Sequence, residues 1–126
     1  MFGTKGLALA GRVRPHPFDV SVADRGRVLV VRVQGEVDAA TAPQVGETVN
    51  RLLGERRSVV LDLERVDFMD LHGLAVVIRA TRKARKEGGS FAIARPAPCV
   101  RRLVGLVHAE GELRVLPDGT DPLHAA

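Results

Sequence analysis

Short runs of branched apolar residues alternate with longer amphipathic stretches along most of this chain, and that alternation restricts the folds open to it. A hairpin is indicated first, because Phe18–Val22 alternates apolar and polar residues, a turn sequence follows at residues 23–26, and Val28–Gln34 is rich in valine. Further short strands are predicted at Ser58–Leu63, Phe91–Ala94 and Leu113–Leu116, the first of them buried on both faces.

Three amphipathic helices are predicted between these strands. The first begins at Thr41, which precedes Gln44 by three residues as in a capping box, and ends near Gly54. The second follows Asp70 and closes at the Gly88-Gly89 pair, and the third follows Pro96 and Pro98. The side chains expected to face the core are Ala42, Val45, Val49, Leu52 and Leu53; Leu74, Val77, Ile78 and Thr81; and Val100, Leu103, Val104 and Val107.

The predicted order is β-β-α-β-α-β-α-β, which is typical of an α/β fold. Helical crossovers between short apolar strands imply a mixed, mostly parallel sheet, in which the amino-terminal hairpin supplies the antiparallel strands. A length of 126 residues suits one domain. We expect that domain over residues 18–116, after a basic, disordered tail over residues 1–17 and before a short irregular tail over residues 117–126.

The charge distribution gives little support for nucleic-acid binding. The net charge is +4 at pH 7, and Lys5, Arg12 and Arg14 in the tail supply three of those charges without any acidic residue beside them. The rest of the chain is close to neutral, and the whole sequence contains four Phe but no Tyr or Trp to stack on bases. Direct DNA binding is therefore not expected.

The cysteine content and the apolar runs indicate a cytoplasmic protein. Cys99 is the single cysteine, so it cannot form an internal disulfide, which favours a reducing compartment. We expect a buried, inert thiol there, although a start-of-helix position could also lower its pKa. The longest apolar run, Leu74–Ile78, is far shorter than the roughly 20 residues that a membrane span needs, so no membrane insertion is expected.

Sequence patterns that would indicate catalysis are missing. The chain has no GxxxxGK[ST] loop, no strand-linked GxGxxG and no GxSxG, so the usual phosphate-binding and nucleophile turns are absent. Its histidines are scattered and lack the spacing of a metal site; they are His16, His72, His108 and His124. We therefore expect neither an enzyme nor a bound cofactor or metal.

Two strand-to-helix turns, Gly35–Pro43 and Val66–Leu74, are the informative segments, and both are expected at the same edge of the sheet. Asp70 is well placed to cap the helix that follows it, which leaves the first N–H groups of that helix pointing outward. A phosphate or carboxylate could dock there. The simpler alternative is that Asp70 only caps and Gly73 only eases helix packing.

These segments together resemble the STAS domain of bacterial anti-sigma factor antagonists. The residues that carry the resemblance are Gly35–Asp38 with Ala40–Pro43, then Val60–Leu63, then Val66–Asp70 with Gly73-Leu74, and it extends from about Phe18 to Leu116. It implies a sheet with helices packed on one side and a binding module without enzymatic activity. It also implies an anti-sigma factor as partner, a serine kinase with a histidine-kinase-like ATPase fold, which phosphorylates the second serine of an Asp-Ser-Ser-Gly turn.

This chain departs from that pattern at the turn itself, where Leu71 and His72 stand in place of the two serines. The phosphoacceptor is absent, so the ≈ −1.5 to −2 charges of a phosphoserine cannot be added there by a serine kinase. The partner-binding surface implied by the resemblance consists of Asp38, Thr41, Asp70, Leu71, His72 and Gly73.

Other interpretations remain open at this point. His72 is a surface residue without a special role, a partner contact, a phosphohistidine or a metal ligand. Asp38 is a turn former or part of the partner surface. The domain could instead be a STAS accessory subunit of a membrane transport complex, or a small-ligand or nucleotide sensor at the helix terminus after Asp70. A run of basic residues is read as a solvated face, or alternatively as a site for an acidic partner: Arg79, Arg82, Lys83, Arg85 and Lys86.

Overall fold

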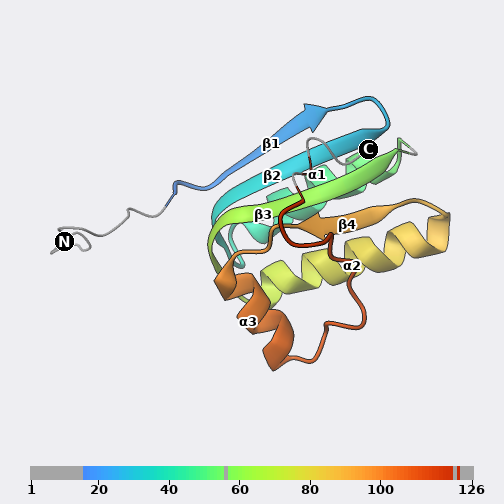
Figure 1. Cartoon of the computed structure of the whole chain (residues 1–126). Coiled ribbons are helices and arrows are strands. Elements are labelled where there is room, and N and C mark those ends of the chain that lie inside the picture. Colours follow the sequence, from blue (N-terminus) through green and yellow to red (C-terminus); the bar gives the residue numbers. More distant parts are fainter. Residues whose placement is uncertain (1–15, 56, 121, 123–126) are drawn as a thin grey trace, which may run out of the picture.

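The computed structural model describes residues 16–55, 57–120 and 122, so the expected tail over residues 1–17 lies almost wholly outside the described residues, as does much of the tail expected over residues 117–126. The elements follow the predicted order through the third helix (Figure 1). They are β1 (Asp19–Asp24), β2 (Val28–Val37), α1 (Ala42–Leu53), β3 (Ser58–Met69), α2 (Leu71–Glu87), β4 (Phe91–Ala94) and α3 (Pro98–Leu106).

The sheet is mixed and has the strand order β1-β2-β3-β4. The hairpin strands β1 and β2 pair antiparallel, whereas β2 with β3 and β3 with β4 pair parallel. Because parallel neighbours need a crossover, α1 and α2 connect these pairs and both begin at the edge of the sheet where β2 and β3 end (Figure 1). The predicted α/β fold is confirmed.

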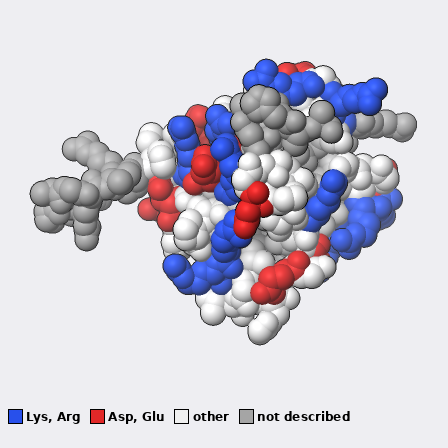
Figure 2. Space-filling view, viewed as in Figure 1, with Lys and Arg blue, Asp and Glu red and all other residues white. Residues whose placement is uncertain are grey.

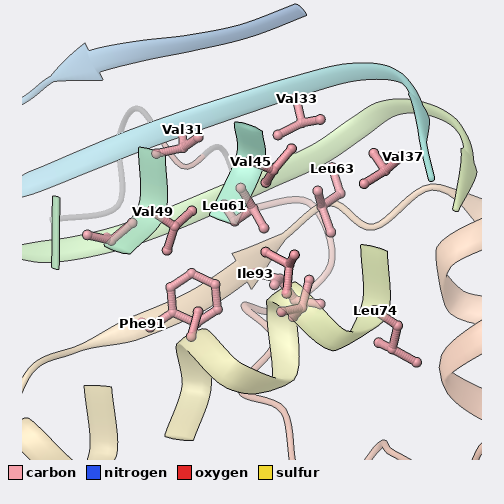
Figure 3. Close-up of a cluster of buried hydrophobic side chains, with 14 of the residues drawn as sticks. Val31, Val33, Val37, Val45, Val49, Leu61, Leu63, Leu74, Phe91 and Ile93 are labelled. Atoms are coloured by element: carbon pink, nitrogen blue, oxygen red, sulfur yellow. The ribbon is translucent and has the colours of Figure 1, made fainter. Parts of the chain in front are cut away.

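One face of the sheet and all three helices share the main core (Figure 3). Alternate residues of the strands point into it, among them Val31 and Val33 from β2 and Leu61 and Leu63 from β3, each of them at most 1% exposed. Burying such a side chain stabilises the fold by roughly 1.5–3 kcal/mol. The opposite face of the sheet carries a smaller buried cluster, with Leu116 packed against it: Val28, Val30, Val60 and Ala94. Strand β3 is therefore buried on both faces over Val59–Leu63, as its apolar run predicts.

The last predicted strand, Leu113–Leu116, is wrong. The chain meets β4 there at a single parallel bridge between Ile93 and Val115, with one hydrogen bond from the Ile93 N–H to the Arg114 carbonyl and one from the Leu116 N–H to the Ile93 carbonyl. The ladder does not continue because its next pair of bonds would need Arg95, and β4 ends at Ala94, with Arg95 at a φ of +48°. Val115 is also 42% exposed, so its apolar side chain does not mark a buried strand.

Strands β2 and β3 continue beyond the predicted ends, Gln34 and Leu63, and this extension positions the candidate turns. The pairing of β2 with β3 shifts register twice, between Arg32 and Gln34 and again between Gly35 and Glu36. Gly35 has a φ of +87°, and a Cβ there would lie 2.8 Å from backbone atoms of Phe18. Only glycine fits such a position, and the irregular pairing lets both strands run on together to Val37 and Met69.

Candidate functional site

The loop between β2 and α1 is closed by Asp38 and Thr41. The Oδ1 atom of Asp38 accepts hydrogen bonds from the N–H of Ala40 at 3.0 Å and of Thr41 at 3.2 Å. The Thr41 hydroxyl donates to the Glu36 carbonyl at 2.7 Å and accepts from the Asp38 N–H at 3.0 Å. Asp38 therefore forms the turn, which agrees with the first of the two interpretations given for it above.

The capping box predicted for Thr41 and Gln44 is wrong. Thr41 does stand at the N-cap of α1, but its side chain makes no capping hydrogen bond. Its hydroxyl is engaged inside the loop instead, and the N–H of Gln44 donates to the Thr41 backbone carbonyl at 3.1 Å. A threonine hydroxyl forms one strong donor bond, and the Glu36 carbonyl at the end of the strand takes it.

The predicted cap at Asp70 is confirmed. Its Oδ1 atom accepts from the N–H of His72 at 2.8 Å and of Gly73 at 3.3 Å. Partial burial raises the pKa of Asp70, but the hydrogen bonds from the N–H and ring of His72 and from the N–H of Gly73 outweigh it, so this pKa lies below its ordinary value of 3.8. The carboxylate occupies these two N–H groups, which favours the simple cap over an anion site at this helix terminus.

The two turns lie side by side. The N–H of Asp70 donates to the Val37 carbonyl at 3.2 Å, and Val37 pairs with Met69 in the sheet. A Cβ on Gly73 would lie 2.7 Å from Cγ of Met69, 2.8 Å from Cγ1 of Val37 and 3.0 Å from the Val37 carbonyl oxygen. Glycine therefore lets the first turn of α2 sit directly on the ends of both strands, and the predicted packing role of Gly73 is confirmed.

This arrangement leaves two side chains of the turn facing solvent. Leu71 is 60% exposed, and the side chain of His72 is 65% exposed. The Nδ1 atom of His72 lies 3.4 Å from Oδ2 of Asp70, which orients the ring with respect to the cap. The turn thus presents an apolar side chain and a hydrogen-bonding ring on a fixed backbone, at positions where the sequence has no hydroxyl.

A groove of about 680 Å³ extends from this turn between α1 and α2. It is lined by residues 39–50 and 71–80, and Leu71 and His72 belong to it. No sequence motif predicts this groove, because its width depends on how far apart the two helices lie.

The other residues singled out from the sequence do not form a second site. Cys99 is half-buried, its thiol donates to the Val66 carbonyl at 3.5 Å, and burial raises its pKa, which fits the inert thiol rather than a reactive one.

On the face shown in Figure 2, basic and acidic side chains are interspersed. On α2, Arg82 pairs with Glu112 and Lys83 with Glu87, as a solvated face would. Within residues 16–120, apart from position 56, no three His, Cys, Asp or Glu side chains gather as a metal site would require.

Sequence reasoning missed one charged cluster on the sheet face away from the helices. Asp62 is 1% exposed, and its Oδ2 atom accepts from Arg32 at 3.2 Å and from Arg95 at 2.7 Å, while its Oδ1 accepts from the N–H of Glu64. The sequence feature that could have indicated this cluster is Asp62 itself, because a carboxylate in a strand buried on both faces needs charged or hydrogen-bonding partners. The cluster lies in mid-strand, away from the turns, and we assign it a structural role.

Comparisons with known proteins agree on one family. The family description "STAS domain" matches residues 19–118. An anti-sigma F factor antagonist from Paenibacillus polymyxa is 30% identical over 92 residues, covering 71% of this chain and 76% of that protein. The anti-sigma-F factor antagonist RsfB of Mycobacterium tuberculosis is 26% identical over 110 residues, covering 86% and 89%.

Solved structures give the same result. The crystal structure of an anti-sigma factor antagonist from Mycobacterium paratuberculosis superposes with a TM-score of 0.73 and 29% identity, covering 85% of this chain and 92% of that one. The unphosphorylated form of the anti-sigma factor antagonist SpoIIAA has a TM-score of 0.65 at 19% identity, a likeness of fold. In the part of the chain that the structure describes, no helix has the length and apolar character to cross a membrane.

Proposed function

Because this chain belongs to the STAS domain family, we propose that it acts as an anti-sigma factor antagonist, a binding module that frees a sigma factor by occupying its inhibitor. The relatives described above carry that description over most of their length. The partner would be an anti-sigma factor with a histidine-kinase-like ATPase fold, and the pair would act in the bacterial cytoplasm. No catalytic step by this chain is part of the proposal.

The observation that carries this proposal is the rigid, exposed turn at residues 70–73. Asp70 caps α2, Gly73 packs on the strand ends, and Leu71 and His72 face solvent beside the loop closed by Asp38 and Thr41. A preorganised surface of this kind loses little conformational entropy when it binds a protein. We assign the contact to Leu71 and His72, the support of the turn to Asp70 and Gly73, and the neighbouring wall to Asp38 and Thr41.

The absence of a hydroxyl in the turn determines how the complex would be regulated. A serine kinase can add no phosphate at Leu71 or His72, and the Thr41 hydroxyl in the neighbouring loop is engaged by the Glu36 carbonyl and the Asp38 N–H. We therefore propose that phosphorylation of this turn by the partner does not release the complex.

The test is a titration with purified anti-sigma factors of the organism that encodes the chain. His72→Glu introduces a carboxylate where a phosphoserine would have placed its charge, and an unpaired charge in an interface costs several kcal/mol, with about 1.4 kcal/mol for each tenfold in affinity. We expect calorimetry to show a loss of roughly 30-fold or more. The neutral variant His72→Gln is the matched control and should stay within a few-fold of wild type.

The melting temperature separates a lost contact from a lost fold. The helix dipole favours an acidic side chain in the first turn, whereas the neighbouring Asp70 carboxylate repels it, so His72→Glu should melt close to the wild-type temperature. Unchanged affinity of His72→Glu would remove the turn from the interface. Failure of the wild-type chain to bind any anti-sigma factor would contradict the proposed function itself.

A further inference from the structure

A tight turn over residues 117–120 follows the bridge to β4. The N–H of Thr120 donates to the Pro117 carbonyl at 3.1 Å, and Gly119, at the third position, has a φ of +81°. Because Asp118 itself lacks a positive φ, this is a type II turn, in which the third position favours glycine. In the whole sequence, Asp118 is the only aspartate or asparagine that directly precedes a glycine.

We propose that Asp118–Gly119 is a site of spontaneous covalent modification, at which the aspartyl bond rearranges to an isoaspartyl bond. In the first step, the backbone nitrogen of Gly119 attacks the protonated side-chain carboxyl group of Asp118. A C–N bond forms, and the carboxyl hydroxyl leaves with the amide proton as water. In the second step, water opens the five-membered imide. Opening at the side-chain carbonyl restores aspartate, whereas opening at the main-chain carbonyl breaks its bond to the Gly119 nitrogen and leaves isoaspartate.

The nitrogen that makes the attack is not engaged elsewhere. The Gly119 N–H donates to no residue that the structure describes, as is usual for the central N–H of a turn. Type I and type II turns differ mainly by a rotation of the central peptide, which here is the Asp118–Gly119 bond. Glycine accepts both conformations, so this peptide can rotate toward the carboxyl group without unfolding of the domain. Glycine also has no side chain to obstruct ring closure.

The carboxyl group of Asp118 is exposed and weakly held. Its side chain is 83% exposed, and Oδ1 accepts one hydrogen bond from Arg101, at 2.8 Å. The carboxylates of Asp38 and Asp70, in contrast, each accept from two backbone N–H groups and precede residues with side chains. Arg101 must release the carboxyl group before it is attacked. Because an exposed ion pair is weak, this restraint slows the reaction about fivefold at most.

The rearrangement changes the surface and leaves the core in place. Residues 117–119 are exposed, so the methylene that enters the main chain meets no buried side chain. The longer main chain no longer fits the turn, and the hydrogen bond between Thr120 and Pro117 is lost together with the ion pair to Arg101. The product carries an exposed isoaspartyl carboxylate, which is the class of substrate that a protein carboxyl methyltransferase would take.

The experiment is an incubation of the full, folded chain at mildly acidic pH, where part of the carboxyl group is protonated. Peptide mapping should show a second form of the peptide that contains the turn, with the same mass and a different retention time. This form should accept a methyl group from an isoaspartyl methyltransferase. Asp118→Glu is the matched control: it keeps the charge but would have to close a six-membered ring, so it should give a single form.

A second pair of variants tests the restraint by Arg101. Arg101→Gln removes the ion pair and should accelerate the appearance of the second form, by about fivefold at most. Arg102→Gln changes the net charge equally, at an exposed position of the same helix that pairs with no described residue, and should react at the wild-type rate. Equal rates in wild type and Arg101→Gln would overturn the restraint.

The chain unfolded in urea provides the remaining comparison, because its turn is open. If it rearranges while the folded chain stays a single form, the native turn blocks the attack and the proposal is overturned. A second form in Asp118→Glu as well would move the modification to another aspartate and would also refute it. The modified chain should melt within a few degrees of the unmodified one, since only exposed residues change.

Discussion

Alanine at Gly73 and alanine at Gly46 should change the free energy of unfolding in opposite directions, although both substitutions add one methyl group to a helix. At Gly73 the new Cβ would lie within 3.0 Å of Met69, the Val37 side chain and the Val37 carbonyl. That carbonyl cannot turn away, because it accepts the N–H of Asp70. At Gly46 the nearest atoms are 3.5 Å away.

The magnitudes follow from packing and helix propensity. Overpacking at Gly73 costs about 1–3 kcal/mol, and the better helix propensity of alanine returns at most about 1 kcal/mol, so a net destabilisation of about 1–2 kcal/mol is expected. Gly46→Ala should stabilise by about 0.5–1 kcal/mol, because only the propensity changes. The two variants should therefore differ by roughly 2 kcal/mol.

Urea unfolding followed by circular dichroism measures this difference. With an m-value of about 1–3 kcal/mol/M, the two midpoints should be separated by about 1 M, with wild type between them and the m-values equal. Equal midpoints, or a Gly73→Ala variant more stable than wild type, would refute the claim that α2 needs glycine to sit on the strand ends. A changed m-value in Gly73→Ala would indicate a rearranged native state instead.

Further predictions concern the buried carboxylate, the cap, the turn and the thiol. Asp62→Ala should lower the free energy of unfolding by roughly 1.5–3 kcal/mol in urea titrations, since it removes the charge-assisted hydrogen bonds that two partly exposed arginines make to this carboxylate. The pKa of Asp70 is lowered on folding, so its contribution is present above about pH 4 and is lost as the pH falls through the folded value; the stability gap between wild type and Asp70→Ala should close there. Incubation with ATP and the anti-sigma factor should label His72→Ser but not wild type, as seen by intact-mass spectrometry. Cys99 should react with a thiol reagent at pH 8 more slowly than a free cysteine peptide does, because its pKa is raised.

The hydrophobic period predicted the elements that bury a whole face, and it failed where one or two hydrogen bonds decide the structure. The predicted core positions Val45, Val49 and Leu74 are buried, as their helical spacing requires. The prediction for Val107 is wrong: it is 41% exposed, because α3 ends one residue before it. Leu113–Leu116 looks like a strand by composition, but it pairs with β4 at a single bridge, because β4 ends at Ala94. The composition of this segment carries no information on the length of β4, the strand it would have to pair with.

The two candidate turns could be predicted only in part, because single hydrogen bonds decide their structure. An aspartate directly before a helix usually caps it, so the capping role of Asp70 could be predicted from its position in the sequence. Thr41 was not, because its hydroxyl can serve the helix or the loop equally well, and the strand end at Glu36 decides which. The extension of β2 past Gly35 depends on a register shift against β3, which is a property of two strands and not of either sequence segment.

Asp62 also restricts which alignments of the strands the chain can adopt during folding. It stands directly opposite Arg32 in β2 and Ala94 in β4. Its ion pairs with Arg32 and with Arg95, the residue that follows β4, therefore tie β3 to both neighbours at one level of the sheet. Sliding β3 by one residue would turn this carboxylate into the apolar layer beneath the helices, far from either guanidinium. Valine-rich strands alone would tolerate such a slip. We therefore expect Asp62→Leu to fold into several competing alignments, visible as extra or broadened amide peaks in its NMR spectrum, even if its unfolding midpoint is preserved.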